Sequence, residues 1–247
     1  MTVLTRAIKA FLVGAFVGLT GQSLIWVCAL FVPPAMAVPA ATLLFGVLGI
    51  ALIGTGFYAG AMEFGGNGAA IPIWGLMFAA AAGRAEAQSK GVAAPKAFWI
   101  GFIPIIKIIG AGFVLAFLLG MALKETGATT VEAPGLIMQF VWAVIIGGAI
   151  SAAAQLLSET KAPFPIIAVI MIAFGGGLLT YFGFMKTFGR LGVGGASMTA
   201  VACGSSAYEA GTVILSGVAA PLIIGVALNI ILVAMGAFAG VFMLDRD

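Results

Sequence analysis

Six long apolar stretches constrain this chain more than any other feature. Each contains about 20 residues or more, the length that an α-helix needs to cross the hydrocarbon core of a bilayer. The sequence therefore predicts a helical membrane protein. The predicted spans cover residues 10–32, 38–61, 97–123, 136–157, 163–185 and 216–244.

The composition supports a membrane protein and argues against a soluble one. Hydrophobic residues make up 63% of the 247 residues and charged residues only 8%, whereas a soluble domain has about 25% charged residues. We expect an all-α, multi-pass protein of the inner (cytoplasmic) membrane. The net charge of +3 is small and scattered along the chain, so nucleic acid is not an expected partner.

Several kinds of chemistry are excluded by the residue types present. The chain has no histidine, which removes serine–histidine catalysis and histidine-bearing zinc motifs. It also lacks the GxxxxGK phosphate-binding motif. Cys28 and Cys203 lie within apolar runs and are interpreted as small buried side chains. We predict no enzymatic activity, no metal site and no cofactor.

Two shorter apolar stretches, residues 67–82 and 192–207, are rich in glycine. Runs of about 16 residues are marginal for a full crossing, and they fit a re-entrant segment or half-helix beside a protected cavity equally well. The first long span follows Arg6 and Lys9 and resembles a signal peptide. We expect it to be retained, because its apolar run is long and its pattern recurs later.

Residues of the first half recur in the second half. Gly14, Gly18 and Gln22 recur after 133 residues as Gly147, Ser151 and Gln155, and Pro39, Phe57 and Phe64-Gly65 recur after 124 residues as Pro163, Tyr181 and Phe188-Gly189. This pattern predicts a first membrane repeat over residues 7–123, a polar linker over 124–135 and a second membrane repeat over 136–244. Internal duplication is typical of transport proteins, whose substrate sites form where two repeats meet.

The distribution of basic residues bears on the topology. If the short stretches are re-entrant, each half has three spans and the two halves have opposite orientations in the membrane. Seven basic residues then lie on the same side of the membrane as the N-terminus, and three lie on the opposite side. If the short stretches cross fully, the ratio is six to four. The positive-inside rule favours the inverted six-span arrangement with a cytoplasmic N-terminus.

Lys107 is the most informative single position, because it lies near the middle of the third span. A charged side chain at this depth should face protein or water rather than lipid. It would attract an anion beside a pathway, or pair with Glu63 or Glu209 in a structural ion pair. Both interpretations stay open.

The glycine-rich stretch after the second span is a candidate anion site. It contains Glu63, Gly65, Gly66, Asn67, Gly68 and Pro72, and its weaker counterpart contains Gly194, Gly195 and Ser197, with Thr199 at the place of Pro72. The short helix that follows would direct its N-terminal amides at a bound anion. The alternative interpretation is that these glycines only allow neighbouring helices to pack tightly. Gln22 and Gln155 occupy equivalent positions in the first span of each half. They are interpreted either as pathway residues or as residues that form hydrogen bonds between helices.

These residues resemble the small membrane subunits of the stage V sporulation protein A (SpoVA) family. The resemblance lies in residues 9–14 with Gly21-Gln22, in residues 64–75, and in 107–110, with a more divergent copy in the second half. It implies a conduit for dipicolinic acid, with calcium, and it assigns Gln22, Glu63, Gly65 to Gly68, Pro72 and Lys107 to the pathway. The family's units usually occur as separate subunits of about half this length, and the second copy lacks counterparts of Pro72 and Lys107.

The sequence thus favours a channel or facilitator for a small carboxylate anion. It would lie in the inner membrane of the spore if the source sporulates, with the lipid bilayer, other SpoVA-type subunits or further copies of itself as partners. Two alternatives remain: a non-conducting scaffold subunit of a larger complex, and an ion-coupled secondary transporter. The transporter is less well equipped, because no carboxylate lies in the middle of a predicted span.

Overall fold

The computed structural model describes residues 2–123, 125–126, 131–160 and 166–246, and the regular elements in this part of the chain are helices. The elements are α1 (Val3–Ala29), α2 (Pro34–Gly54), α3 (Phe57–Gly65), the 3-10 helix η1 (Gly66–Ala70), α4 (Ile73–Ser89), α5 (Ala94–Ala122), α6 (Leu136–Ser158), α7 (Ile166–Tyr181), α8 (Phe184–Ser197), α9 (Ala200–Ile214), α10 (Ala220–Ala239) and η2 (Gly240–Arg246).

Five of these helices are long and apolar enough to cross a membrane: α1, α2, α5, α6 and α10 with its extension. A sixth span is present if α7 and α8 count as one, although the chain bends by 113° between them. The predicted class, an all-α multi-pass membrane protein, is confirmed.

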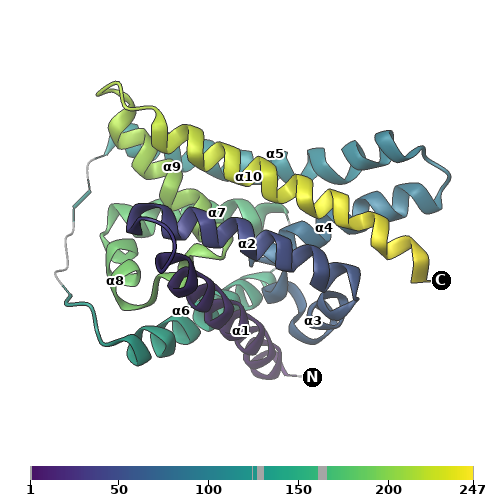
Figure 1. The fold of residues 1–247 in the computed structure, drawn as a ribbon, viewed down its shortest axis with the longest axis horizontal. Helices are drawn as coiled ribbons and strands as arrows, with labels where there is room; N and C mark the ends of the chain where they lie inside the picture. Colours follow the sequence, from purple (N-terminus) through teal and green to yellow (C-terminus); the bar gives the residue numbers. More distant parts are fainter. Residues whose placement is uncertain (1, 124, 127–130, 161–165, 247) are drawn as a thin grey trace.

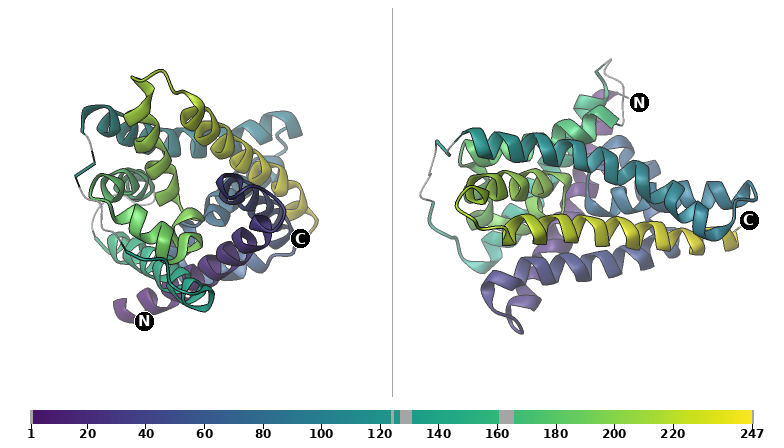
Figure 2. Two further views of the ribbon diagram at one scale, coloured as in Figure 1. Left: turned by 60° about the vertical axis from the view of Figure 1, so that its left-hand side comes forward. Right: turned by 90° about the horizontal axis from the view of Figure 1, so that it is seen from above.

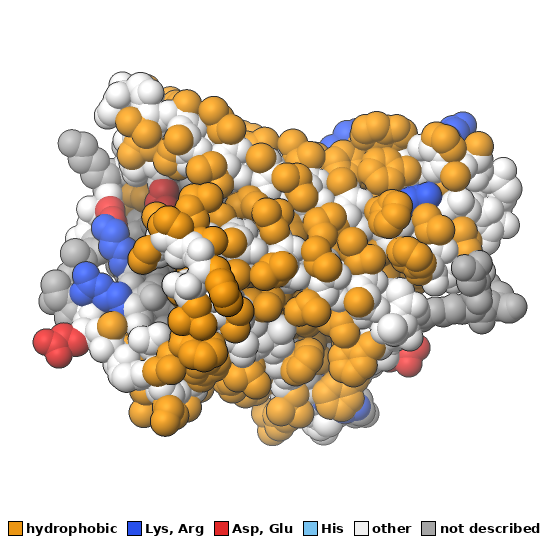
Figure 3. All heavy atoms as spheres, in the orientation of Figure 1, with side chains coloured by type: hydrophobic (Ala, Val, Ile, Leu, Met, Phe, Trp, Pro, Cys, Tyr) orange, Lys and Arg blue, Asp and Glu red, His pale blue; other side chains and the backbone are white. Residues whose placement is uncertain are grey.

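Helices α2, α5 and α10 run along the long axis of the molecule, whereas α1 crosses this direction obliquely (Figures 1 and 2). The C-terminus lies at the right-hand end in Figure 1, and the N-terminus lies at the lower edge. Apolar side chains cover the middle of the surface, and the visible charged side chains gather toward the two ends (Figure 3). This distribution favours a bilayer normal roughly along the long axis, because charged groups prefer the aqueous faces.

Two predicted spans differ from the observed helices. The span predicted over 38–61 ends at Gly54, because the chain turns at Gly56, whose φ of 79° suits a glycine. The span predicted over 163–185 ends at Tyr181, and its first three residues lie outside the described part of the chain.

The two halves contain elements in matching order. Gly56 and Gly183, 127 residues apart, both have a φ of 79° and precede α3 and α8. The predicted alignment by 124 residues is wrong for these elements, since Phe57 begins α3 whereas Tyr181 ends α7. The matching order supports an internal repeat, which stays a prediction together with its boundaries.

Small residues allow α1 and α6 to cross closely. A Cβ atom at Gly14 or Gly18 would overlap backbone carbonyl oxygens of α6, at Gly147 and Ala143 respectively. Small residues of this kind let two membrane helices approach closely. A Cβ atom added at Gly60 in α3 would instead meet nothing within 4 Å.

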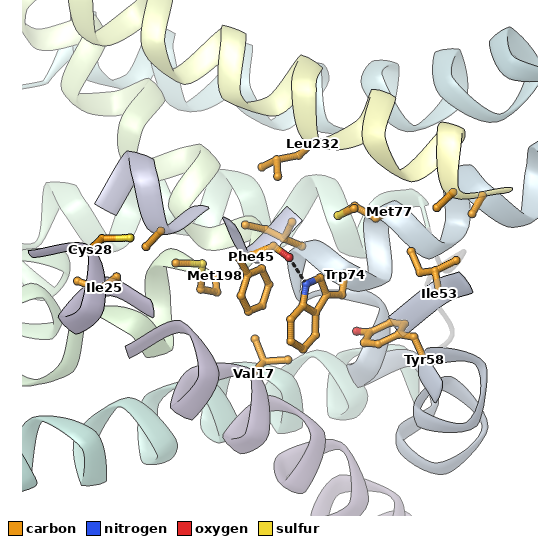
Figure 4. Close-up of a cluster of buried hydrophobic side chains, with 14 of the residues drawn as sticks. Val17, Ile25, Cys28, Phe45, Ile53, Tyr58, Trp74, Met77, Met198 and Leu232 are labelled. Carbon is orange, nitrogen blue, oxygen red and sulfur yellow. Dashed lines mark hydrogen bonds between the residues drawn. The ribbon is translucent and has the colours of Figure 1, made fainter. Parts of the chain in front are cut away.

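An aromatic cluster fills the core between α2, α3 and α4 (Figure 4). The Trp74 indole stacks on Phe45, with ring centroids 3.9 Å apart, and its Nε1–H donates to the Phe45 carbonyl oxygen at 2.6 Å. The Tyr58 hydroxyl donates to the Ala69 carbonyl oxygen at 2.7 Å. These rings are buried and satisfied, so they form a compact block within the first half.

Candidate functional site

Two breaks in the helices meet at the centre of the molecule. The first separates η1 from α4 at Pro72, and the second separates α8 from α9 at Thr199. The two breaks pair as an isolated antiparallel bridge. The Ile73 N–H donates to the Met198 carbonyl oxygen at 3.0 Å, and the Ala200 N–H donates to the Ile71 carbonyl oxygen at 3.1 Å.

Helices α4 and α9 therefore both begin at this bridge and run toward opposite ends of the molecule (Figure 1). The N-terminus of a helix carries a partial positive charge of about half a unit. Two such termini would together contribute a partial positive charge at the centre of the molecule, where no basic side chain of α4 or α9 lies in their first turns. This arrangement favours an anion over a cation.

Two glutamines hold the broken segments from opposite sides. The Gln22 Oε1 atom of α1 accepts a hydrogen bond from the Gly194 N–H at 3.0 Å, and the Gln155 Oε1 atom of α6 accepts one from the Gly68 N–H at 3.1 Å. Both glutamine side chains are buried. They satisfy backbone groups that would otherwise lack a partner in an apolar environment, and neither lines the cavity described below.

We expect Gln22→Leu and Gln155→Leu each to destabilise the protein by about 1–2 kcal/mol, because each leaves a buried N–H without an acceptor. Thr20→Val in α1 is the matched control, since its hydroxyl bonds only to the Phe16 carbonyl oxygen within the same helix. Thermal unfolding of the detergent-purified variants measures the effect. Equal midpoints for the glutamine variants and the control would contradict this role.

A cavity of about 580 Å³ lies beside the bridge, between α2, α4, α8, α9 and α10. Its inner end reaches Thr199 and Ile73, and its outer end reaches Lys186 and Pro221 near the α7–α8 and α9–α10 turns. Its wall is mostly apolar, with a few hydroxyl and amide groups. The polar uncharged lining residues are Thr42, Ser197, Thr199, Ser205, Ser206 and Asn229.

One hydroxyl group of this wall is unusual. The Ser197 Oγ atom is buried and has no hydrogen-bond partner among the described residues. Ser197 is the last residue of α8 and lies directly before the break. A buried hydroxyl normally has a partner, so this group is free to bond a solute or water at the inner end of the cavity.

Two charged side chains contribute to the wall of the cavity. Lys186 lies near the start of α8, and its Nζ atom pairs with the Glu125 carboxylate at 2.5 Å. Glu209 lies in α9. The outer part of the cavity therefore has one charge of each sign, whereas the inner end has the two helix N-termini and no charged side chain.

The structure brings some of the predicted site residues together and leaves others apart. Ser197 and Glu209 line the cavity, Pro72 lies at the bridge, and Gly194 and Gly68 bind the two glutamines. Gly65 and Gly195 instead pack against other helices, at Val13 and Ala143. Glu63, Gly66 and Asn67 are exposed and line no part of this cavity.

Lys107 is not part of this site. Its side chain is exposed on the outer surface of α5, outside the cavity. The sequence predicts that the Lys107 side chain faces protein or water, but within the described part of this single chain it does not pack against other helices. Among the described residues it makes no ion pair with Glu63 or Glu209. The physical reason is the helical period: Ile109, two residues on, faces the core and places Lys107 on the opposite side.

Sequence reasoning missed most of the second half's contribution. Ser205 and Ser206 of α9 line the cavity beside the predicted Glu209, as do Lys186 and Asn229. Ser205 lies four residues and Ser206 three residues before Glu209, and such spacings are typical of one helix face. That spacing could have predicted a polar face on the second short segment.

Comparisons with known proteins give one match. Residues 6–124 match the model of the SpoVAC/SpoVAEB sporulation membrane protein family. No curated protein and no solved structure matches the chain. The matched part includes α1 to α5, and so the Pro72 break but not the Thr199 break.

Proposed function

We propose that this multi-pass membrane protein, whose residues 6–124 match the model of the SpoVAC/SpoVAEB sporulation membrane protein family, passes a small carboxylate anion across the inner membrane. The observation that carries the proposal is the cavity that ends where the N-termini of α4 and α9 meet. Discontinuous helices with N-termini at mid-membrane are a recurring device for binding anionic groups in transport proteins. Dipicolinic acid, with calcium, is the substrate that the family resemblance implies.

We propose that this structure represents the conduit in a closed state. The cavity approaches the bridge from the side of Lys186, and the buried cluster of Phe45, Trp74 and Tyr58 lies beyond Met198 on the other side (Figure 4). A solute that reaches the bridge therefore meets packed aromatic rings. We propose that membrane tension or a partner protein separates these elements and opens the path.

The orientation follows from charge. Arg6, Lys9, Lys90 and Lys96 lie in or next to the helix ends that share the side of the N-terminus, whereas Lys186 and Arg190 lie in α8 at the other side. The positive-inside rule then places both ends of the chain in the cytoplasm. The mouth of the cavity would face away from the cytoplasm.

We expect the charged residues of the cavity to change the rate of anion passage in opposite directions. Lys186→Gln should lower anion flux a few-fold, because it removes positive potential near the mouth, and Glu209→Gln should raise it, because it removes repulsion. The measurement is efflux of dipicolinate from liposomes that contain the purified chain. Equal, measurable flux for both variants and the wild type, with equal amounts of folded protein, would mean that these charges do not act on the path, and absence of flux in all three would argue for a non-conducting scaffold.

A further inference from the structure

The outer face of α5 has a charged side chain in an apolar surface. Lys107 is exposed, and the same face exposes Ile103, Val114 and Leu118 at intervals of about one or two helical turns. Helix α5 runs along the outside of the bundle when the molecule is viewed from above (Figure 2). Within the part of the chain that the structure describes, no carboxylate pairs with the Lys107 ammonium.

This position is deep in the bilayer. Helix α5 has 29 residues, and Lys107 lies about 20 Å from its first residue at 1.5 Å per residue. A lysine near a helix end can extend its ammonium to the interface, but the middle of a spanning helix is beyond that reach. An exposed ammonium at this depth is unfavourable in lipid, and such groups pair with protein or line water.

The surface around Lys107 permits a close approach by another helix. Gly110 and Ala111 lie one turn further along α5, and a Cβ atom added at Gly110 would meet nothing within 4 Å. Small residues let the backbones of two membrane helices come close together. A facing helix could therefore bring a side chain to the Lys107 ammonium.

We infer that this face of α5, defined by Ile103, Lys107, Gly110, Ala111 and Val114, binds a transmembrane helix of a different polypeptide that has an Asp or Glu near its middle. Charge complementarity selects this occupant. A second copy of this chain does not supply it, because no described acidic residue lies midway along one of the membrane-spanning helices. Pairing two α5 helices through this face would also bring two ammonium groups together. The inference is independent of the proposed function.

The test uses the full-length chain in liposomes with synthetic membrane-spanning helices of roughly 25 residues. Three labelled leucine–alanine helices differ only at the central residue, which is Glu, Gln or Leu. Association is measured by energy transfer at about pH 8, well above the ordinary pKa of a glutamate. We expect the Glu helix to bind the wild-type chain at least about tenfold more tightly than the Leu helix.

Variants of the chain assign the effect to Lys107. Lys107→Leu should abolish the preference for the Glu helix. Lys107→Glu should transfer the preference to a fourth helix of the same design whose central residue is Lys. Lys96→Leu, at the first turn of the same helix, should leave the preference unchanged. Equal binding of the Glu and Gln helices to the wild type, or a preference that survives Lys107→Leu, would overturn the inference.

Discussion

Replacing Gly14 with leucine is expected to abolish the folded protein. Gly14 lies where α1 crosses α6, and a Cβ atom there would overlap the Gly147 carbonyl oxygen and the Ser151 side chain. A backbone carbonyl cannot rotate away as a flexible side chain can, so the helices must separate. Overpacking of this kind costs about 3 kcal/mol or more. We expect no monodisperse protein after detergent extraction of the Gly14→Leu variant.

Alanine substitutions separate the packing effect from helix propensity. Gly175, within α7, has nothing within 4 Å of an added Cβ atom. Gly175→Ala should therefore raise the unfolding midpoint, since alanine favours a helix by about 1 kcal/mol over glycine. Gly14→Ala should lower it. Shifts of the same sign at both positions would show that the α1–α6 crossing is not as close as described.

Filling the inner end of the cavity should stop anion passage. Ala202 lies in the first turn of α9 and lines the cavity next to the bridge. In Ala202→Trp, an indole would occupy space that a solute needs, and it would also cover the N-terminus of α9. We expect dipicolinate flux to fall at least about tenfold, which corresponds to a barrier increase of roughly 1.4 kcal/mol.

The matched control is Ala149→Trp, which adds the same side chain to the exposed face of α6, away from the cavity. This variant should conduct as the wild type does. Its unfolding midpoint and that of Ala202→Trp show whether either change disturbs the fold. Equal flux from a well-folded Ala202→Trp variant would mean that anions do not use this cavity.

The helical membrane class could be predicted from the sequence because it depends on local properties. Apolar runs as long as those of α1, α5 and α6 determine both secondary structure and environment. The ends of α2 and α7 could not be placed with the same accuracy. The turns at Gly56 and Gly183 interrupt sequences that remain apolar, so hydropathy alone does not reveal them.

The candidate site was only partly predictable. The sequence indicated two special short segments, and Pro72 and Thr199 do lie at the breaks that meet. The cross-pairing of Gln22 with Gly194 depends on residues 172 positions apart, and a single sequence contains no signal for such a contact. Lys107 shows the opposite problem: depth along a helix can be read from the sequence, but the direction of one side chain depends on packing.

Release of dipicolinate and chloride from liposomes that contain the wild-type chain alone, before and after an osmotic downshift, tests the central claim most directly. We expect both anions to leave after the downshift, with sucrose retained and with release lost in Ala202→Trp. Retention of both anions by vesicles that hold correctly folded wild-type protein would contradict a pathway through this one chain. The scaffold interpretation would then be the better description.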